Sequence, residues 1–382
     1  MPATLLDEQQ KQQQARPEPS KTRSLWIRRV TFAALGLFLA LNTVLWVKCG
    51  NDKVSHDMWS GVGSIDVAVD CYNKVAQKPK VVLMGSSLMM YPFWSVDKER
   101  NPSIGDIFHH RESIELASAL AEPAQPKPLV YSFAIFGQMI SDGYLYVDQF
   151  LKGDKAPEYV VLGIAPRDFH DSDLSAPMAT YSFKRLVTLT NFFDYARMYL
   201  PTFQDQADFV LGRSVFFYGR RWRLQKEVNH AFEKVYAVFG IKSPVAEQPR
   251  TQAGFMLAAR EDVRWDGSKN EYARRYRGID TSKDVALQLA FLHRVLDLCS
   301  KRNIKVVLVN MPLSDINRGL LPAGFYEQFR QDLAAAANRQ GVKYLDLGSD
   351  PSFTHADFWD TSHLNNSGGH KLIDRIKPLL AS

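Results

Sequence analysis

The sequence is poor in cysteine and in runs of like charge, and each shortage excludes a class of protein. Three cysteines in 382 residues give no disulfide framework, although Cys71 and Cys299 could pair in an oxidising compartment. Cysteine and histidine nowhere have the spacing of a structural zinc site, so we predict no metal. The net charge is only +6 and no long basic run is present, which argues against nucleic-acid binding.

The chain also lacks long apolar runs, with one exception. Residues Val30 to Val47 contain no charge, and a run of this length is enough for a transmembrane helix. Trp26 and Trp46 lie near its ends, as interfacial aromatic residues do. Four basic residues precede the run and two closely follow it, which places the N-terminus in the cytoplasm by the positive-inside rule.

A cleaved signal peptide is the alternative for this run. The run is longer than a usual signal-peptide core, and no small-x-small cleavage site follows it. We therefore expect a single-pass protein of the cell (inner) membrane, with its main domain in the periplasm or outside the cell. The expected segments are a disordered cytoplasmic tail at 1–24, the anchor at 25–48, a connecting segment at 49–79 and an α/β domain at 80–382.

Five short apolar runs, rich in β-branched residues, are typical of buried strands. They lie at 80–85, 128–137, 157–166, 304–312 and 342–348. Helical patterns lie between them, and the alternation predicts a parallel five-stranded sheet with helices on both faces. The region from about 170 to 280 breaks the rhythm and is aromatic and basic, so we predict a mostly helical insertion. It either covers the substrate site, contacts the membrane, does both, or is a packed subdomain with a solvated basic face.

Polar residues follow several of these strands, at the sheet edge where α/β proteins bind ligands. Ser86 and Ser87 follow the first strand, in "VVLMGSSLMM", and Gly137 follows the second. Arg167 and Asp168 follow the third. The helix expected after Ser87 would aim its N-terminal N–H groups at an oxyanion, and Gly137 would add another N–H.

The loop "DFWDTSHLN" places Asp360 three residues before His363, after the last strand. An aspartate at that distance can bind Nδ1 of the imidazole and leave Nε2 free as a base. Asp106 and His109 have the same spacing but lie remote from the other motifs. Taken alone, Ser86 or Ser87 is more simply explained as a helix cap, and His363 as an ordinary loop histidine. Together they form a set for acyl transfer, with Ser87 as the nucleophile and Ser86 as the other candidate.

These motifs resemble three blocks of the GDSL/SGNH hydrolase superfamily. "GSSLM" resembles the first block and maps the nucleophile onto Ser87; "FAIFGQMISD" resembles the second and maps an oxyanion donor onto Gly137. "DFWDTSHLNNSGG" resembles the last and maps the catalytic pair onto Asp360 and His363. The likeness covers roughly residues 80 to 170 and 285 to 380. It implies a flavodoxin-like three-layer α/β/α fold.

Two departures from the family pattern concern the site. Ser86 stands where the family usually has aspartate, as in membrane-anchored relatives similar to D-alanyl-transfer and polysaccharide O-acetylation proteins. The third block, "GIAPRDF", has no asparagine to serve as an oxyanion donor. Either the oxyanion is bound by only two donors, or Arg167, which is next to Asp168, supplies the donor that the asparagine would have given.

The resemblance implies a membrane-anchored serine esterase or acyltransferase without a cofactor. Its substrate would be an O-acyl group, O-acetyl by the likeness, on a cell-surface or secreted polysaccharide, and a membrane-bound O-acyltransferase would be a partner. The alternative is a catalytically degenerate domain that binds glycan or scaffolds a polysaccharide-modification complex. A dinucleotide-binding protein is disfavoured, because "GSSLMM" lacks the three-glycine spacing.

Overall fold

The structure is a computed structural model of the whole chain. It describes residues 21–49, 61–123, 125–174, 176–221, 260–279 and 285–380, with the single residues Val228 and Lys283. Contacts divide the chain into two compact units. One comprises Met1–Lys53 with Ala207–Ala246, and the other comprises Val54–Gln206 with Glu247–Ser382. We describe each unit by itself.

The larger unit is built on a five-stranded sheet in which every strand pair is parallel. The strands are β1 Val81–Met84, β2 Val130–Ser132, β3 Tyr159–Ile164, β4 Lys305–Asn310 and β5 Val342–Asp346. Their order is β2-β1-β3-β4-β5. The predicted parallel five-stranded sheet is confirmed. This order reverses direction between β1 and β3, and in such sheets ligands bind beyond the carboxyl ends of the strands at that point.

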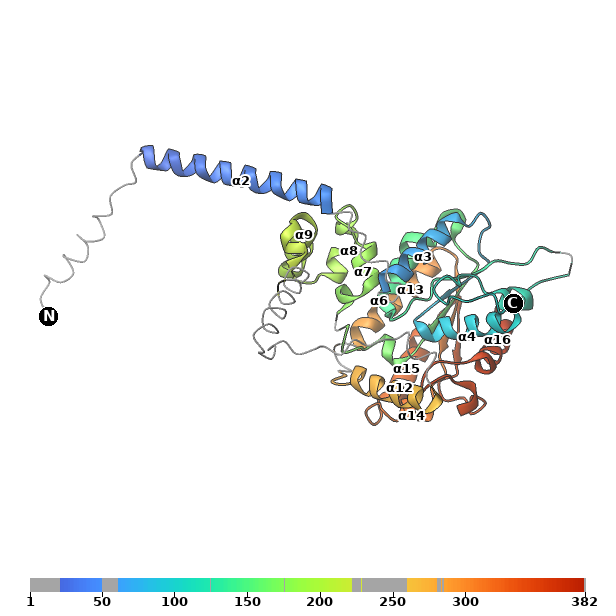
Figure 1. The fold of residues 1–382 in the computed structure, drawn as a ribbon. Helices are drawn as coiled ribbons and strands as arrows, with labels where there is room; N and C mark the ends of the chain where they lie inside the picture. Colours follow the sequence, from blue (N-terminus) through green and yellow to red (C-terminus); the bar gives the residue numbers. More distant parts are fainter. Residues whose placement is uncertain are drawn as a thin grey trace, which may run out of the picture. The chain divides into compact units, whose positions relative to one another are not determined.

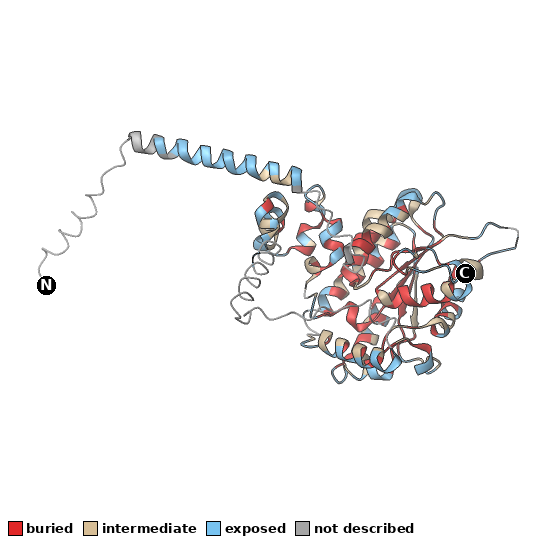
Figure 2. Ribbon diagram, in the orientation of Figure 1, coloured by how far each residue is buried: buried red, intermediate tan, exposed pale blue. Residues whose placement is uncertain are grey.

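Helices cover both faces of the sheet (Figure 1). On one face, α4 (Ser87–Arg100) and α16 (Asn366–Leu380) pack together over Leu83 and Val161. On the other face, α6 (Ile140–Phe150) packs against α13 (Ala286–Lys301), and both approach Met84. The strands are therefore apolar on both sides, which explains their continuous runs of valine and leucine. Buried residues concentrate in the sheet and in the helix faces turned toward it (Figure 2).

The remaining helices of the described chain lie before, between and after these. They are α3 Gly61–Lys74, α5 Ile114–Ala119, α7 Tyr181–Leu186, α8 Phe192–Tyr199, α9 Phe203–Ser214, α10 Phe216–Gly219, α12 Glu261–Arg275, α14 Asp315–Arg318 and α15 Phe325–Ala337. The described part of the predicted insertion is helical, as expected. Residues 222–227 and 229–259 of the insertion lie outside the described residues.

Helix α3 lies in the segment predicted as a simple connection. Its Tyr72 is buried and packs edge-on against Tyr131 and at a tilt against Phe133, with ring centroids 4.9 and 4.7 Å away. Its hydroxyl donates a hydrogen bond of 2.8 Å to the carbonyl of Lys155. The segment is thus part of the α/β unit. Cys71 of this helix and the buried Cys299 are both free thiols, so the structure contains no pairing between them.

The smaller unit contains α2 (Lys21–Cys49), the one described helix that is long and apolar enough to cross a membrane. Its candidate span is Arg28–Lys48, and none of the apolar window is buried inside the protein (Figure 2). The predicted tail at 1–24 lies almost wholly outside the described residues. The sequence-based expectation of one apolar helix near the N-terminus is confirmed.

Candidate active site

The turn between β1 and α4 is built so that Ser87 begins the helix. Gly85 has φ +141°, a conformation that L side chains rarely adopt, and an added Cβ would lie 2.5 Å from the carbonyl oxygen of Gly163. Only glycine fits this turn. Ser86 occupies the cap position, but its side chain makes no capping hydrogen bond. The interpretation of these serines as helix-capping hydroxyls therefore fails for Ser86.

Ser87, His363 and Asp360 form a continuous chain of contacts across 276 residues of sequence. Ser87 Oγ lies 2.9 Å from Nε2 of His363, and Nδ1 of the same ring lies 2.8 Å from Oδ2 of Asp360. A carboxylate can only accept, so the proton is on Nδ1, and Nε2 is left to accept the proton of Ser87. The His363 side chain is 15% exposed, so the serine–histidine pair is accessible from solvent.

The loop that carries Asp360 and His363 is a tight turn held by the aspartate itself. Oδ1 of Asp360 accepts the backbone N–H groups of Ser362 and His363, at 2.8 and 3.0 Å. The N–H of Trp359 donates to the carbonyl of His363 at 2.7 Å and closes the loop. Aspartate favours such turns because its short side chain reaches the backbone two or three residues on. One carboxylate therefore shapes the loop with one oxygen and orients the imidazole with the other.

The Asp360 carboxylate is charged in this environment. Burial alone would raise its pKa, but the charge and ring hydrogen bond of His363, with the two backbone N–H groups, outweigh burial and lower it. An ionised aspartate at Nδ1 stabilises the imidazolium that forms when Nε2 takes a proton.

Two backbone N–H groups are positioned as oxyanion donors. As the first residue of α4, Ser87 has an N–H without an intrahelical partner, at the positive end of the helix dipole. Gly137 follows β2 with φ +71°, and among the described residues its N–H has no hydrogen-bond acceptor. The turn is held in place because Ile135 N–H donates to the carbonyl of Gly85 at 3.0 Å.

Arg167 lies buried beneath the Gly137 turn. A Cβ added to Gly137 would lie 3.3 Å from an Nη of Arg167. The guanidinium donates to Oδ2 of Asp171 at 2.7 and 3.1 Å and to the carbonyl of Gln138 at 3.3 Å. Its donors are thus used to hold the turn, and the structure gives Arg167 a supporting position.

Asp168 and Ser86 lie together behind the nucleophile. Burial raises the pKa of Asp168 to about 6, although the charge of Arg167, the hydrogen bond from Ala165 N–H and the nearby Ser86 hydroxyl oppose the rise. The Ser86 hydroxyl is buried and close to this carboxyl, but it makes no hydrogen bond of standard geometry. Ser86 does not contact His363, so the imidazole selects Ser87 between the two serines.

Helix α12 of the insertion holds the loop that carries Asp360 and His363, a position that the sequence did not assign to any residue. Ser268 Oγ lies 2.6 Å from Oγ1 of Thr361, and Arg264 donates to the carbonyl of Trp359 at 3.2 Å. From the other side, Asn317 of α14 donates to Oγ1 of Thr361 at 3.2 Å. Thr361 is completely buried between these helices. The loop is therefore fixed from two directions.

Tyr91 is a second residue that sequence reasoning missed. Its ring lies 4.4 Å from the ring of His363, tilted by 38°. Burial first, and the charge of Asp360 second, raise the pKa of its phenol, so the ring stays neutral beside the imidazole. Tyr91 lies four residues after Ser87 on the same helix, and this i,i+4 spacing is the signal that identifies it.

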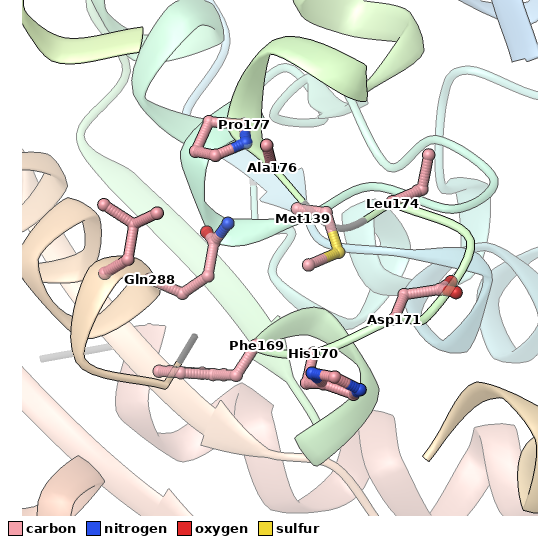
Figure 3. Close-up of a pocket in the computed structure, with 9 residues that line it drawn as sticks. Met139, Phe169, His170, Asp171, Leu174, Ala176, Pro177 and Gln288 are labelled. Atoms are coloured by element: carbon pink, nitrogen blue, oxygen red, sulfur yellow. The ribbon is translucent and has the colours of Figure 1, made fainter. Parts of the chain in front are cut away.

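A small pocket is lined by residues that follow β2 and β3 in the sequence, including Met139 and Asp171 (Figure 3). Met139, Phe169, His170 and Gln288 are among its lining residues, and Asp171, the acceptor of Arg167, borders it. Its volume is about 10 Å³, which is at most the space of one water molecule. The pocket cannot hold an acyl substrate. Among the described residues no group of three or more His, Cys, Asp or Glu side chains could hold a metal ion.

The second Asp-x-x-His pair is a local surface contact. Nδ1 of His109 contacts a carboxylate oxygen of Asp106, but the His109 side chain is 55% exposed. Only the Asp360–His363 pair is joined to a serine in the described structure. The sequence matches no protein-family model, and a search of curated proteins also gives no match.

Proposed function

We propose that this protein is a serine O-acyl esterase or O-acyltransferase of the SGNH type, anchored in the cell membrane by α2. The single observation that carries the proposal is the Ser87–His363–Asp360 chain, with contacts of 2.9 and 2.8 Å at the carboxyl edge of a parallel sheet. The strand order 2-1-3-4-5 and the Gly85 turn support the flavodoxin-like three-layer assignment.

In the proposed reaction Ser87 Oγ attacks the carbonyl carbon of an acyl ester while Nε2 of His363 takes its proton. The N–H groups of Ser87 and Gly137 stabilise the oxyanion, and Asp360 stabilises the imidazolium. The tetrahedral intermediate expels the alcohol, which receives the proton from Nε2 and leaves an acyl-Ser87 ester. Water then gives hydrolysis, whereas a sugar hydroxyl gives transfer; His363 deprotonates either one.

The proposed substrate is an O-acyl group, O-acetyl in particular, on a cell-surface or secreted polysaccharide. This rests on the resemblance of "GSSLM" to membrane-anchored O-acylation proteins and on the apolar length of α2. A cytoplasmic N-terminus, an extracytoplasmic catalytic domain and a membrane-bound O-acyltransferase partner belong to the same proposal. An active-site domain tethered by one helix stays within reach of membrane-embedded assembly enzymes.

The second candidate is a non-catalytic SGNH-type domain that binds glycan or scaffolds such a complex. The observation in its favour is the missing oxyanion asparagine. Arg167 does not replace it, because its guanidinium donates to Asp171 and to the carbonyl of Gln138. Loss of one oxyanion donor costs about 3 kcal/mol of transition-state stabilisation.

A fluorophosphonate probe on the detergent-solubilised full chain separates the two candidates. We expect the wild type and Ser86→Ala to be labelled at Ser87, as located by mass spectrometry, and Ser87→Ala to remain unlabelled. Absence of labelling in the wild type, with circular dichroism showing a folded chain, would favour the non-catalytic candidate. Labelling of Ser87→Ala that is lost in Ser86→Ala would show that we chose the wrong serine.

A further inference from the structure

The smaller unit contains an unusual contact between the membrane-spanning candidate α2 and the insertion. Asn42 of α2 donates from Nδ2 to the carbonyl of Ser214 at 2.9 Å, and its Oδ1 accepts the N–H of Phe216 at 2.7 Å. Trp46, one helical turn later, donates from its indole to the same Ser214 carbonyl at 3.2 Å. Both polar atoms of the Asn42 side chain are therefore paired with backbone.

The partner of these bonds is the break between α9, which ends at Ser214, and α10, which begins at Phe216. Helix ends carry backbone groups without intrahelical partners, and in a lipid environment such groups must be satisfied by protein. An asparagine in an apolar helix is costly unless it is paired. Asn42 thus pairs with backbone groups at the helix break, and the break pairs with both polar atoms of the Asn42 side chain. The Trp46 ring also packs edge-on against Phe216, with ring centroids 5.8 Å apart.

The depth of this contact follows from helix geometry. Asn42 precedes Lys48, the end of the candidate span, by six residues, which is about 9 Å along the axis. Trp46 is a residue type that favours the membrane–water interface. With α2 spanning the membrane as proposed, the α9–α10 break meets α2 in the outer part of the acyl-chain layer, at a depth that interfacial amphipathic helices reach.

The outer side of α9–α10 has the chemistry of that interface. Val210, Leu211 and Phe217 are 36%, 42% and 43% exposed, whereas the rings of Phe209 and Phe216 in the same helices are buried. Three arginines accompany them: Arg213 lies over Phe209 at 3.8 Å, Arg220 over Phe216 at 4.3 Å and Arg221 over Tyr218 at 4.0 Å. Apolar side chains beside arginines suit a layer of acyl chains under anionic headgroups.

We propose that α9–α10 is a lipid-binding element that lies in the membrane interface at the Lys48 end of α2. Val210, Leu211 and Phe217 contact acyl chains, and Arg213, Arg220 and Arg221 contact anionic phospholipid phosphates. This rests on the proposed membrane anchoring by α2 and on no part of the catalytic proposal. The α9–α10 part of the insertion then contacts lipid, while α12 contacts the loop that carries Asp360 and His363.

Depth-dependent quenching in lipid nanodiscs tests the proposal on the full chain. Leu211→Cys or Phe217→Cys is labelled with an environment-sensitive fluorophore in a Cys49→Ser, Cys71→Ser background; Cys299 is fully buried and stays. The nanodiscs contain phosphatidylcholine and phosphatidylglycerol, with spin labels in the headgroup or on the acyl chain. Phe38→Cys of α2 reports on the anchor, and Val263→Cys, 46% exposed on α12, reports on the catalytic unit.

We expect shallow spin labels to quench the probes at 211 and 217 and deep labels to quench the probe at 38; the probe at 263 provides the signal of the other unit for comparison. Arg220→Gln with Arg221→Gln should lower quenching at 217 in anionic nanodiscs toward its value in pure phosphatidylcholine. If 38 is quenched and 211 and 217 are not, the lipid-binding proposal is wrong and the anchor stands. If 38 is not quenched, the anchor itself is wrong. Probes at 211 and 217 that are shielded from both water and lipid would indicate a protein partner and overturn the proposal.

Discussion

The hydroxyl oxygens of Ser268 and Thr361 lie 2.6 Å apart, and this contact joins the helical insertion to the turn between Asp360 and His363. Both side chains are buried, with relative exposures of 1% and 0%. The position of His363 thus depends on a helix that lies outside the α/β framework. The contact makes the insertion a part of the candidate active site without supplying a proposed reacting group.

Ser268→Ala should therefore weaken catalysis through geometry. We expect a loss of stability of about 1 kcal/mol. Hydrolysis of p-nitrophenyl acetate should show a lower kcat, by up to about 10²-fold if the loop shifts by an ångström. KM should change little, because Ser268 does not border the acyl group. Ser300→Ala, at an exposed serine of α13, is the control and should leave kcat unchanged. A kcat equal to that of the wild type would show that α12 does not position His363.

Asp360→Asn tests the orientation of the imidazole. An amide at this position can donate to Nδ1 and favour the wrong tautomer, so kcat should fall by about 10³- to 10⁴-fold. Asp106→Asn removes the carboxylate of the other Asp-x-x-His pair and should leave kcat unchanged. Initial rates with p-nitrophenyl acetate measure both. Equal effects of the two substitutions would contradict the assignment of Asp360.

Gly137→Ala tests the second oxyanion donor. A left-handed residue other than glycine costs about 1–2 kcal/mol, and here the new Cβ also meets Arg167 at 3.3 Å. We expect kcat to fall by about 10²-fold, as when one oxyanion donor is lost. Gly153→Ala is the matched control, because Gly153 also has a positive φ of 56° but an added Cβ there meets nothing within 4 Å. It should lower the thermal midpoint and spare kcat.

Asp168 gives the fold a defined dependence on pH. Its pKa is raised from the ordinary 3.8 to about 6 by burial, so between these values the unfolded chain has lost the proton that the folded chain keeps. The contribution of Asp168 to stability should therefore fall as pH rises from about 4 to 6, by about 3 kcal/mol, and change no further above that. Asp168→Asn should remove this component, so the difference between variant and wild-type unfolding free energies grows through the same window. A difference independent of pH would contradict the raised pKa of Asp168.

The strands could be predicted because each is marked by a short local run of apolar residues. The approach of Ser87 to His363 could be predicted because both lie next to the ends of such strands. A run such as Val306–Val309, which is wholly apolar within β4, is typical of a strand buried on both faces. Parallel strands then bring their carboxyl ends together, so Ser87 and His363 could be expected to approach each other despite their separation in sequence. The roles of Ser87, His363 and Asp360 in catalysis stay predictions.

Other features had no such signal. Helix α3 was missed because its sequence begins with glycines and is rich in β-branched residues, which weakens a helical pattern. The Ser268–Thr361 contact crosses 93 residues and an insertion whose placement no periodicity determines. Tyr91 was within reach of prediction, since its spacing from Ser87 follows from the helix itself.

The turn that Asp360 closes has a consequence for comparing this chain with its relatives. The same carboxylate holds the backbone and orients His363, so a homologue that had lost acyl transfer would still need it to fold this loop. The Ser87 side chain has no such structural role in the described residues. It does not cap the helix, and its hydroxyl contacts only the imidazole of His363. Under the proposed function, the serine, and not the more recognisable Asp-x-x-His sequence, is therefore the position expected to differ between active and inactive homologues.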